Sequence, residues 1–211
     1  MCVKKILRKF IPKIILNYIK HLKKPIQYIS WVRKGKKAPP PHFIKVDTIR
    51  KYAKRFKFKV FVETGTCYGD TINEVKHLFT KVFSVELDRK LYEKSKKRFK
   101  DYPNIELFNG DSSDILPKIL PQIKEPILFW LDAHYSGGVT RRGKKESPII
   151  EELEAIFNYY REKSVILVDD ARCFLGKNDY PSIEELKNFL KKIHLGLKLK
   201  IENDIVVISK F

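Results

Sequence analysis

Residues 61–71 of the chain read Phe-Val-Glu-Thr-Gly-Thr-Cys-Tyr-Gly-Asp-Thr. A short β-rich run, Val60–Glu63, leads into the two glycines Gly65 and Gly69, and an amphipathic stretch, Thr71–Phe79, follows. Glycine lets the backbone turn tightly and allows a ligand to approach it closely. A strand, a glycine turn and a helix in this order predict a ligand site at the carboxyl end of a strand in an open α/β sheet.

Short β-rich runs and amphipathic stretches alternate along the rest of the chain, which predicts βαβ units. Further strands are expected at Val82–Glu86, Ile105–Phe108, Ile127–Leu131 and Val165–Asp169, and further helices at Val46–Arg55, Lys90–Phe99 and Ile149–Tyr160. Two more β-rich runs, Leu197–Ile201 and Ile205–Ser209, are separated by three polar residues, which predicts a closing hairpin. The expected fold class is α/β: a Rossmann-like, doubly wound, mostly parallel seven-stranded sheet with an antiparallel C-terminal hairpin.

Charge is distributed unevenly over the 211 residues. The first 59 residues hold 19 of the 44 Lys and Arg but only one of the 25 Asp and Glu. The remainder is therefore close to neutral, which argues against a body built to grip a polyanion. We expect a basic helical extension and a Pro-rich linker over residues 1–41, and the main domain over residues 42–211.

Apolar residues recur at helical spacing within residues 3–24, and lysines and arginines fill much of the remaining surface. Pro12 is expected to kink this helix. A basic amphipathic helix can lie on an anionic membrane surface. The alternative is that it packs on the body or on a second copy of the chain, so a homo-oligomer is also open. No apolar run reaches the roughly 18 residues that a membrane span requires.

The three cysteines, Cys2, Cys67 and Cys173, are widely spaced and form no Cys-x-x-Cys pair. Neither a disulfide framework nor a zinc site follows from them. We therefore expect a reduced, cytoplasmic protein, which would be peripheral to a membrane if its N-terminal helix binds there.

Acidic residues stand at the ends of the predicted strands. Glu86 ends the second strand, where an acid about 20 residues beyond the glycine turn can hold ribose hydroxyls. Asp111 and Ser112 follow the third strand. Neither a GxGxxG dinucleotide fingerprint nor a P-loop is present. The negative charge of Glu63 beside the turn would repel a pyrophosphate and attract a cation.

Together these motifs resemble the class I S-adenosylmethionine (SAM)-dependent methyltransferases, closest in style to small catechol-type and macrolide-sugar O-methyltransferases. The stretch Glu63–Thr71 resembles the family's first motif in a looser form, and Cys67 departs from it by standing where many members have a second glycine. The resemblance covers about residues 58–211 and implies SAM as the cofactor. The cofactor-binding residues that it implies are Glu63, Thr64, Gly65, Thr66, Gly69, Thr71, Glu86, Asp111, Ser112 and Asp132.

The fourth and fifth predicted strands end in Asp132 and in the pair Asp169-Asp170. Three converging carboxylates repel one another unless a cation or basic residues neutralise them, and oxygen ligands of this kind suit Mg²⁺ or Ca²⁺ rather than zinc. In the metal-dependent enzymes that the chain resembles, acids at these strand ends hold a Mg²⁺ that binds the acceptor hydroxyls. Mg²⁺ held by these three residues is therefore a candidate second cofactor. The alternative is that Asp132 caps a turn while the pair binds Arg172 or Arg141.

His134 is the candidate general base, because an imidazole can accept a hydroxyl proton near neutral pH. Asp132 is the second candidate catalytic residue. A glycine-rich, basic loop follows, and its Tyr135, Arg141 and Arg142 are candidates for contact with the acceptor. A buried structural histidine and a merely solvated loop are the alternatives.

We therefore expect a SAM-dependent O-methyltransferase that acts on a hydroxyl of a sugar, glycan or other polyhydroxylated small acceptor. A nucleic-acid methyltransferase or binder that uses the basic arm is the weaker alternative, because the body is neutral and no Asn-Pro-Pro-Tyr-like motif follows the fourth strand. A non-catalytic interaction module with the same cofactor fold is the third hypothesis.

Overall fold

The computed structural model describes residues 24–133, 147–159, 163–193 and 196–210. Its centre is a seven-stranded sheet in the order β3-β2-β1-β4-β5-β7-β6. The strands are β1 (Val60–Thr64), β2 (Lys81–Glu86), β3 (Ile105–Asn109), β4 (Ile127–Leu131), β5 (Val165–Val168), β6 (Lys198–Glu202) and β7 (Ile205–Ser209). Strands β1 to β5 pair in parallel, whereas β7 pairs antiparallel with both β5 and β6. The predicted fold class is confirmed.

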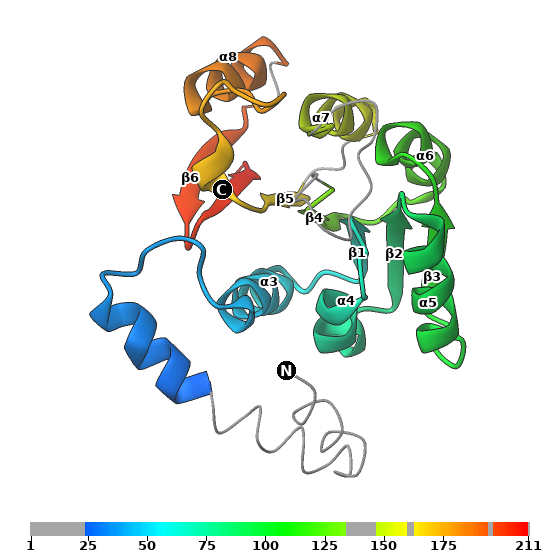
Figure 1. The fold of residues 1–211 in the computed structure, drawn as a ribbon. Coiled ribbons are helices and arrows are strands. Elements are labelled where there is room, and N and C mark those ends of the chain that lie inside the picture. The colour runs from blue at the N-terminus through cyan, green and yellow to red at the C-terminus, as the bar shows by residue number, and fades with distance from the viewer. Residues whose placement is uncertain (1–23, 134–146, 160–162, 194–195, 211) are drawn as a thin grey trace.

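Six of the described helices cover the sheet, three on each face (Figure 1). One face carries α3 (His42–Phe56), α4 (Asp70–Val75) and α5 (Arg89–Phe99). The other carries α6 (Ser112–Ile119), α7 (Ile149–Asn158) and α8 (Ile183–Lys192). Short 3₁₀ turns follow α4, α6 and β5, at η1 (Lys76–Leu78), η2 (Leu120–Gln122) and η3 (Ala171–Cys173).

Apolar clusters lie on both faces of the sheet, and the neighbouring strands β4 and β5 are apolar along their whole length, as is typical of buried parallel sheets. Val60 and Val62 of β1 point into the cluster beneath α6, α7 and α8, whereas Phe61 points into the cluster beneath α3, α4 and α5. Side chains alternate between the two faces of a strand. Glu63 therefore lies on the α3 face, at the carboxyl end of β1.

The predicted bounds of β4 and β7 match the structure. Strands β1, β2, β3 and β5 differ from prediction by one residue at one end, and β6 is shifted by one residue at both ends. The helix expected at Thr71–Phe79 is shorter, because it ends at Val75 and continues as η1. Helices α6 and α8 were not predicted. Their start signals are local: α8 begins with a capping box formed by Ser182 and Glu185, and α6 begins at the side-chain cap of Asp111.

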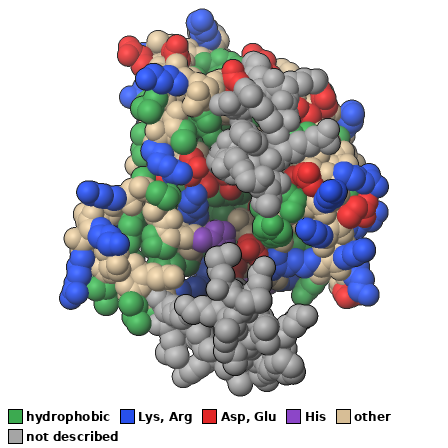
Figure 2. All heavy atoms as spheres, viewed as in Figure 1, with side chains coloured by type: hydrophobic (Ala, Val, Ile, Leu, Met, Phe, Trp, Pro, Cys, Tyr) green, Lys and Arg blue, Asp and Glu red, His purple; other side chains and the backbone are tan. Residues whose placement is uncertain are grey.

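A helix over residues 24–33 precedes α3 and is the blue ribbon in Figure 1. Lys and Arg side chains lie over this helix and over α5 on the face seen in Figure 2. Four large apolar side chains of the helix are exposed, namely Ile26, Tyr28, Ile29 and Val32. The segment predicted to bind membranes, residues 3–24, lies outside the described residues except for Lys24. No described helix is long and apolar enough to cross a membrane.

Candidate active site

Four acidic residues lie together at the carboxyl ends of adjacent strands, and we call them the acidic edge. They are Glu63 of β1, Glu86 of β2, and Asp132 and Asp169, which directly follow β4 and β5. Backbone hydrogen bonds from Asp132 to Thr64 and from Asp169 to Leu131 continue the strand ladder past the ends of β4 and β5. Because side chains alternate along each strand, all four acids lie on the same face of the sheet, the face covered by α3.

Glu63 is 1% exposed and lies at the centre of this edge. The Ser84 hydroxyl donates to its Oε2 at 2.6 Å, and the Thr66 hydroxyl lies 2.6 Å from Ser84 Oγ. Burial raises the pKa of Glu63 well above its usual value, and the charges of Asp132 and Glu86 raise it further. A cationic ligand at this edge would relieve the repulsion among the three carboxylates.

Glu86, at the end of β2, links this strand to the glycine turn through hydrogen bonds. Its Oε2 accepts the backbone N–H of Cys67 at 2.6 Å, and its Oε1 accepts the backbone N–H of Asp88 at 2.8 Å. Burial raises the pKa of Glu86, and these two N–H groups oppose that rise. A carboxylate offers about four acceptor positions. The two backbone contacts therefore leave acceptor capacity on both oxygens, which suits a ligand with two neighbouring hydroxyls.

The turn between β1 and α4 packs tightly on both sides. Gly65 has a φ of +81°, and a β-carbon added there would lie 2.4 Å from the carbonyl oxygen of Asp132. Gly69 has a φ of +71°, and a β-carbon there would lie 2.4 Å from the ring of Phe99. Cys67, between them, also has a positive φ of 50°. It therefore adopts the backbone conformation that glycine reaches without strain.

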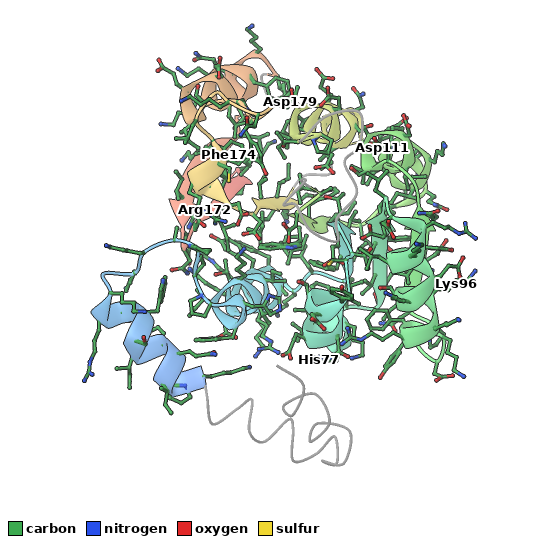
Figure 3. All side chains as sticks on the ribbon, viewed as in Figure 1. His77, Lys96, Asp111, Arg172, Phe174 and Asp179 are labelled. Atoms are coloured by element: carbon green, nitrogen blue, oxygen red, sulfur yellow. The ribbon has the colours of Figure 1, made fainter. Side chains whose placement is uncertain are left out.

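Asp111 is the N-terminal cap of α6. Its Oδ1 accepts the backbone N–H of Ser113 at 3.1 Å and the Ser113 hydroxyl at 2.7 Å. Ser112 beside it is buried. Figure 3 labels Asp111 at the start of α6, across the strand ends from Arg172 in η3. Contact of Asp111 and Ser112 with adenine stays a prediction, as do the ligand contacts of Thr64, Thr66 and Thr71.

Basic side chains hold the carboxylates at the end of β5. Lys45, which belongs to α3, forms ion pairs with Asp169 and Asp170, and its Nζ lies 3.0 Å from Asp170 Oδ1. The same Asp170 oxygen lies 2.8 Å from Arg172, which also pairs with Asp204. The sequence offered the pairing of Asp170 with Arg172 as the alternative to a metal site. It gave no signal for Lys45, which lies outside every motif.

These contacts do not fit a metal ion. The Lys45 ammonium group binds both acids that were expected to ligate Mg²⁺ after β5. Within the described ranges, no group of three His, Cys, Asp or Glu side chains is arranged to hold a metal. The predicted Mg²⁺ site at Asp132, Asp169 and Asp170 is therefore not supported. The physical reason is that α3 brings a protein cation to the carboxylates.

A cavity opens beside Asp132 and Asp169, between the ends of β4 and β5 and the start of α7. Its polar lining includes Ser147, Glu152 and Tyr180, none of which the sequence singled out. Burial raises the pKa of Tyr180 above its usual value, so its hydroxyl stays protonated at neutral pH. The cavity therefore lies next to the acidic edge and has polar side chains in its wall.

The candidate base and the candidate acceptor contacts on the basic loop lie outside the described residues. They are His134, Tyr135, Arg141 and Arg142. Their roles therefore stay predictions.

Solved structures of O-methyltransferases share this architecture. TomG from Streptomyces achromogenes, involved in tomaymycin synthesis and solved with SAM, is 16% identical, has a TM-score of 0.56 and aligns over 78% of each chain. A Bacillus cereus O-methyltransferase in complex with S-adenosylhomocysteine (SAH) is 12% identical, with a TM-score of 0.60 over 87% of this chain and 88% of that chain. The chain has the class I SAM-dependent methyltransferase fold.

A putative caffeoyl-CoA O-methyltransferase from Staphylococcus aureus shares the same fold at 13% identity, with a TM-score of 0.58 over 94% of this chain and 98% of that chain. No protein-family model and no curated protein matches the sequence. In this methyltransferase fold the acidic edge lies at the carboxyl ends of the strands, where open α/β sheets bind their ligands.

Proposed function

We propose that the chain is a SAM-dependent O-methyltransferase that acts on a hydroxyl of a sugar, glycan or other small polyhydroxylated acceptor. The observation that carries the proposal is the convergence of Glu63, Glu86 and Asp132 beside the turn at Gly65. SAM carries a sulfonium cation and two ribose hydroxyls. A cluster of acidic side chains therefore suits it better than it suits the phosphates of a nucleotide. The SAM and SAH complexes among the structures with this fold support the same choice.

Each part of the site would have a separate task. Glu86 would accept hydrogen bonds from the ribose hydroxyls, Gly65 would let the cofactor lie against the backbone, and Asp111 with Ser112 would meet the adenine. When bound, SAM supplies a methyl group activated by its positive sulfur, so that a C–O bond can form as the C–S bond breaks.

The chain's own residues would align the acceptor and remove its proton. His134 would take the proton of the attacking hydroxyl as general base. Glu152 and Tyr180 line the cavity beside the acidic edge and would bind further hydroxyls of the acceptor. Arg141 and Arg142 would contact an anionic group if the acceptor carries one. Holding the acceptor in line with the methyl group is the main catalytic contribution in such a reaction.

Transfer of a radiolabelled methyl group tests this function. The purified full chain is incubated with labelled SAM and, separately, with monosaccharides, glycolipids, catechols and RNA. We expect label in a polyhydroxylated acceptor, and we expect His134→Ala to lower turnover by about 10²–10⁴-fold with unchanged SAM affinity. Label that enters RNA instead would favour the nucleic-acid alternative. SAM binding without transfer to any acceptor would favour the non-catalytic module.

We further propose that the N-terminal extension attaches this cytoplasmic enzyme to an anionic membrane surface. In the helix over residues 24–33, Ile26 is 69% exposed and Ile29 is 50% exposed. Arg33, Lys34, Lys36 and Lys37 follow closely. Apolar side chains beside cationic ones favour an anionic interface, where each Lys or Arg contributes about 1 kcal/mol. A second copy of the chain would be the alternative partner for this surface.

A further inference from the structure

The Lys45 ion pairs are buried. Its side chain is 16% exposed, whereas the side chains of Asp169 and Asp170 are 2% and 9% exposed. Solvent-exposed ion pairs contribute little, but removing one partner of a buried pair leaves an uncompensated charge away from water. Lys45 is therefore bound to the end of β5 by largely buried ion pairs and differs from a solvated surface lysine.

Helix α3 holds Lys45 in this position through its packing on the sheet. Residues three, four and seven positions later share its face of the helix. These residues are Thr48, Ile49 and Tyr52, and all three are buried. The face that carries Lys45 therefore packs on the protein body, and its ammonium group reaches carboxylates that lie 124 and 125 positions away in the sequence.

A divalent ion would compete with Lys45 for the same oxygens. Mg²⁺ requires near-octahedral oxygen ligands at about 2.0–2.1 Å. Asp169 Oδ2 and Asp170 Oδ1 already accept the Lys45 ammonium, and Asp170 Oδ1 also accepts Arg172. An ion placed on these oxygens would also lie close to two positive side chains, which would repel it.

We infer that Lys45 is a built-in cation that replaces a divalent metal at the ends of β4 and β5. Its ammonium group neutralises Asp169 and Asp170 and so fixes the wall of the cavity in which the acceptor would bind. Lys45 is thus a positioning residue, and the enzyme works without a metal. The role in acceptor binding rests on the proposed function, whereas the replacement of a metal by Lys45 can be tested without it.

Mn²⁺ binding, followed by electron paramagnetic resonance on the full chain, tests the inference. Lys45→Met keeps an unbranched side chain but removes the charge, and it should bind one Mn²⁺ at least about tenfold more tightly than the wild type, because Lys45 no longer competes with the ion for the oxygens of Asp169 and Asp170. Lys45→Met combined with Asp169→Asn should lose this binding. Lys45→Arg keeps a cation and should behave like the wild type.

Lys51→Met is the matched control, because Lys51 belongs to the same helix but pairs with Glu202, away from the cavity. It should leave Mn²⁺ binding unchanged. Tight Mn²⁺ binding by the wild type that Asp169→Asn abolishes would overturn the inference. A folded Lys45→Met that binds Mn²⁺ no better than the wild type would also overturn it, since the carboxylates would then not form a cation site.

If Lys45→Met does not fold, the wild type and Asp169→Asn decide the question by themselves. Equal and weak Mn²⁺ binding by the two proteins supports the inference, and strong binding by the wild type alone contradicts it. SAM binding, measured by calorimetry on the same proteins, reports on the proposed function separately. Its absence from the wild type would contradict the methyltransferase proposal and leave the Mn²⁺ result valid.

Discussion

The backbone of Gly65 lies directly against the end of β4, so that a β-carbon at this position would be 2.4 Å from the carbonyl oxygen of Asp132. The same residue has a φ of +81°, in the left-handed region that favours glycine. The glycine turn after β1 and Asp132, the candidate catalytic residue after β4, therefore lie directly against each other through their backbones.

Gly65→Ala should destabilise the protein for two reasons. Left-handed backbone costs a side-chain-bearing residue about 1–2 kcal/mol, and the collision with Asp132 should add about 1–3 kcal/mol, the usual cost of overpacking. Gly35→Ala separates the two effects. Gly35 has a similar φ of +73°, but an added β-carbon there would meet no described residue within 4 Å other than its two chain neighbours. Urea denaturation should show a clearly larger decrease in the free energy of unfolding for Gly65→Ala than for Gly35→Ala. Equal decreases in the two variants would mean that the close approach to Asp132 adds nothing to the cost of the substitution.

Cys67 offers a second test of the same turn. Its φ of 50° makes glycine acceptable and a β-branched residue unfavourable. We expect Cys67→Gly to keep the wild-type melting temperature within a few degrees and to keep SAM affinity, and Cys67→Val to lower both. Thermal melting with and without SAM measures the difference. If the two variants behave alike, the left-handed backbone at this position does not limit the turn.

The sequence predicted those elements and residues that belong to a local, repeating pattern. Strand alternation, the glycines at 65 and 69 and the acids at strand ends predicted the sheet and most of the acidic edge. Lys45 could not be found in this way, because its link to Asp169 spans 124 positions and depends on how α3 packs. Tyr180 was missed for a similar reason, since it reaches the cavity from a loop without a motif. The predicted Mg²⁺ site is not supported, because repelling carboxylates indicate a neutralising cation without showing whether it is a metal ion or a basic side chain.

Glu63 should make the stability of the cofactor-free protein depend on pH. Its pKa is raised well above the usual 4.5 by burial, so the folded protein retains a proton that the unfolded chain releases as the pH rises past that value. Stability therefore falls as the pH rises through the window between the two pKa values. Glu63→Gln has no such proton, so its melting temperature relative to the wild type should increase from about pH 4.5 upward. The melting temperatures of the two proteins are measured between about pH 4 and 8. A constant difference between them over this range would contradict a buried, protonated Glu63.

Deleting residues 1–40 should separate membrane attachment from folding. The sheet and α3, which begins at His42, remain in the shortened chain. It should therefore melt near the wild-type temperature and bind SAM equally well, but it should no longer sediment with phosphatidylserine vesicles. The full chain should bind those vesicles less strongly as salt is added, because exposed charges are screened. Binding of the full chain to neutral vesicles that is as strong as to anionic ones would contradict the electrostatic mechanism.

Calorimetric titration of SAM into the wild type and Glu86→Ala tests the proposed function most directly. We expect one SAM per chain in the wild type, and weaker binding in Glu86→Ala by about 1.5–3 kcal/mol, the range for hydrogen bonds to a charged group. Glu106→Ala is the control, since Glu106 is an exposed acid on the neighbouring β3 that pairs with Lys81. It should bind SAM like the wild type, and all three proteins should be checked for folding by thermal melting. Absence of SAM binding to the folded wild type, or identical affinity in Glu86→Ala, would contradict the assignment of the acidic edge as a SAM site.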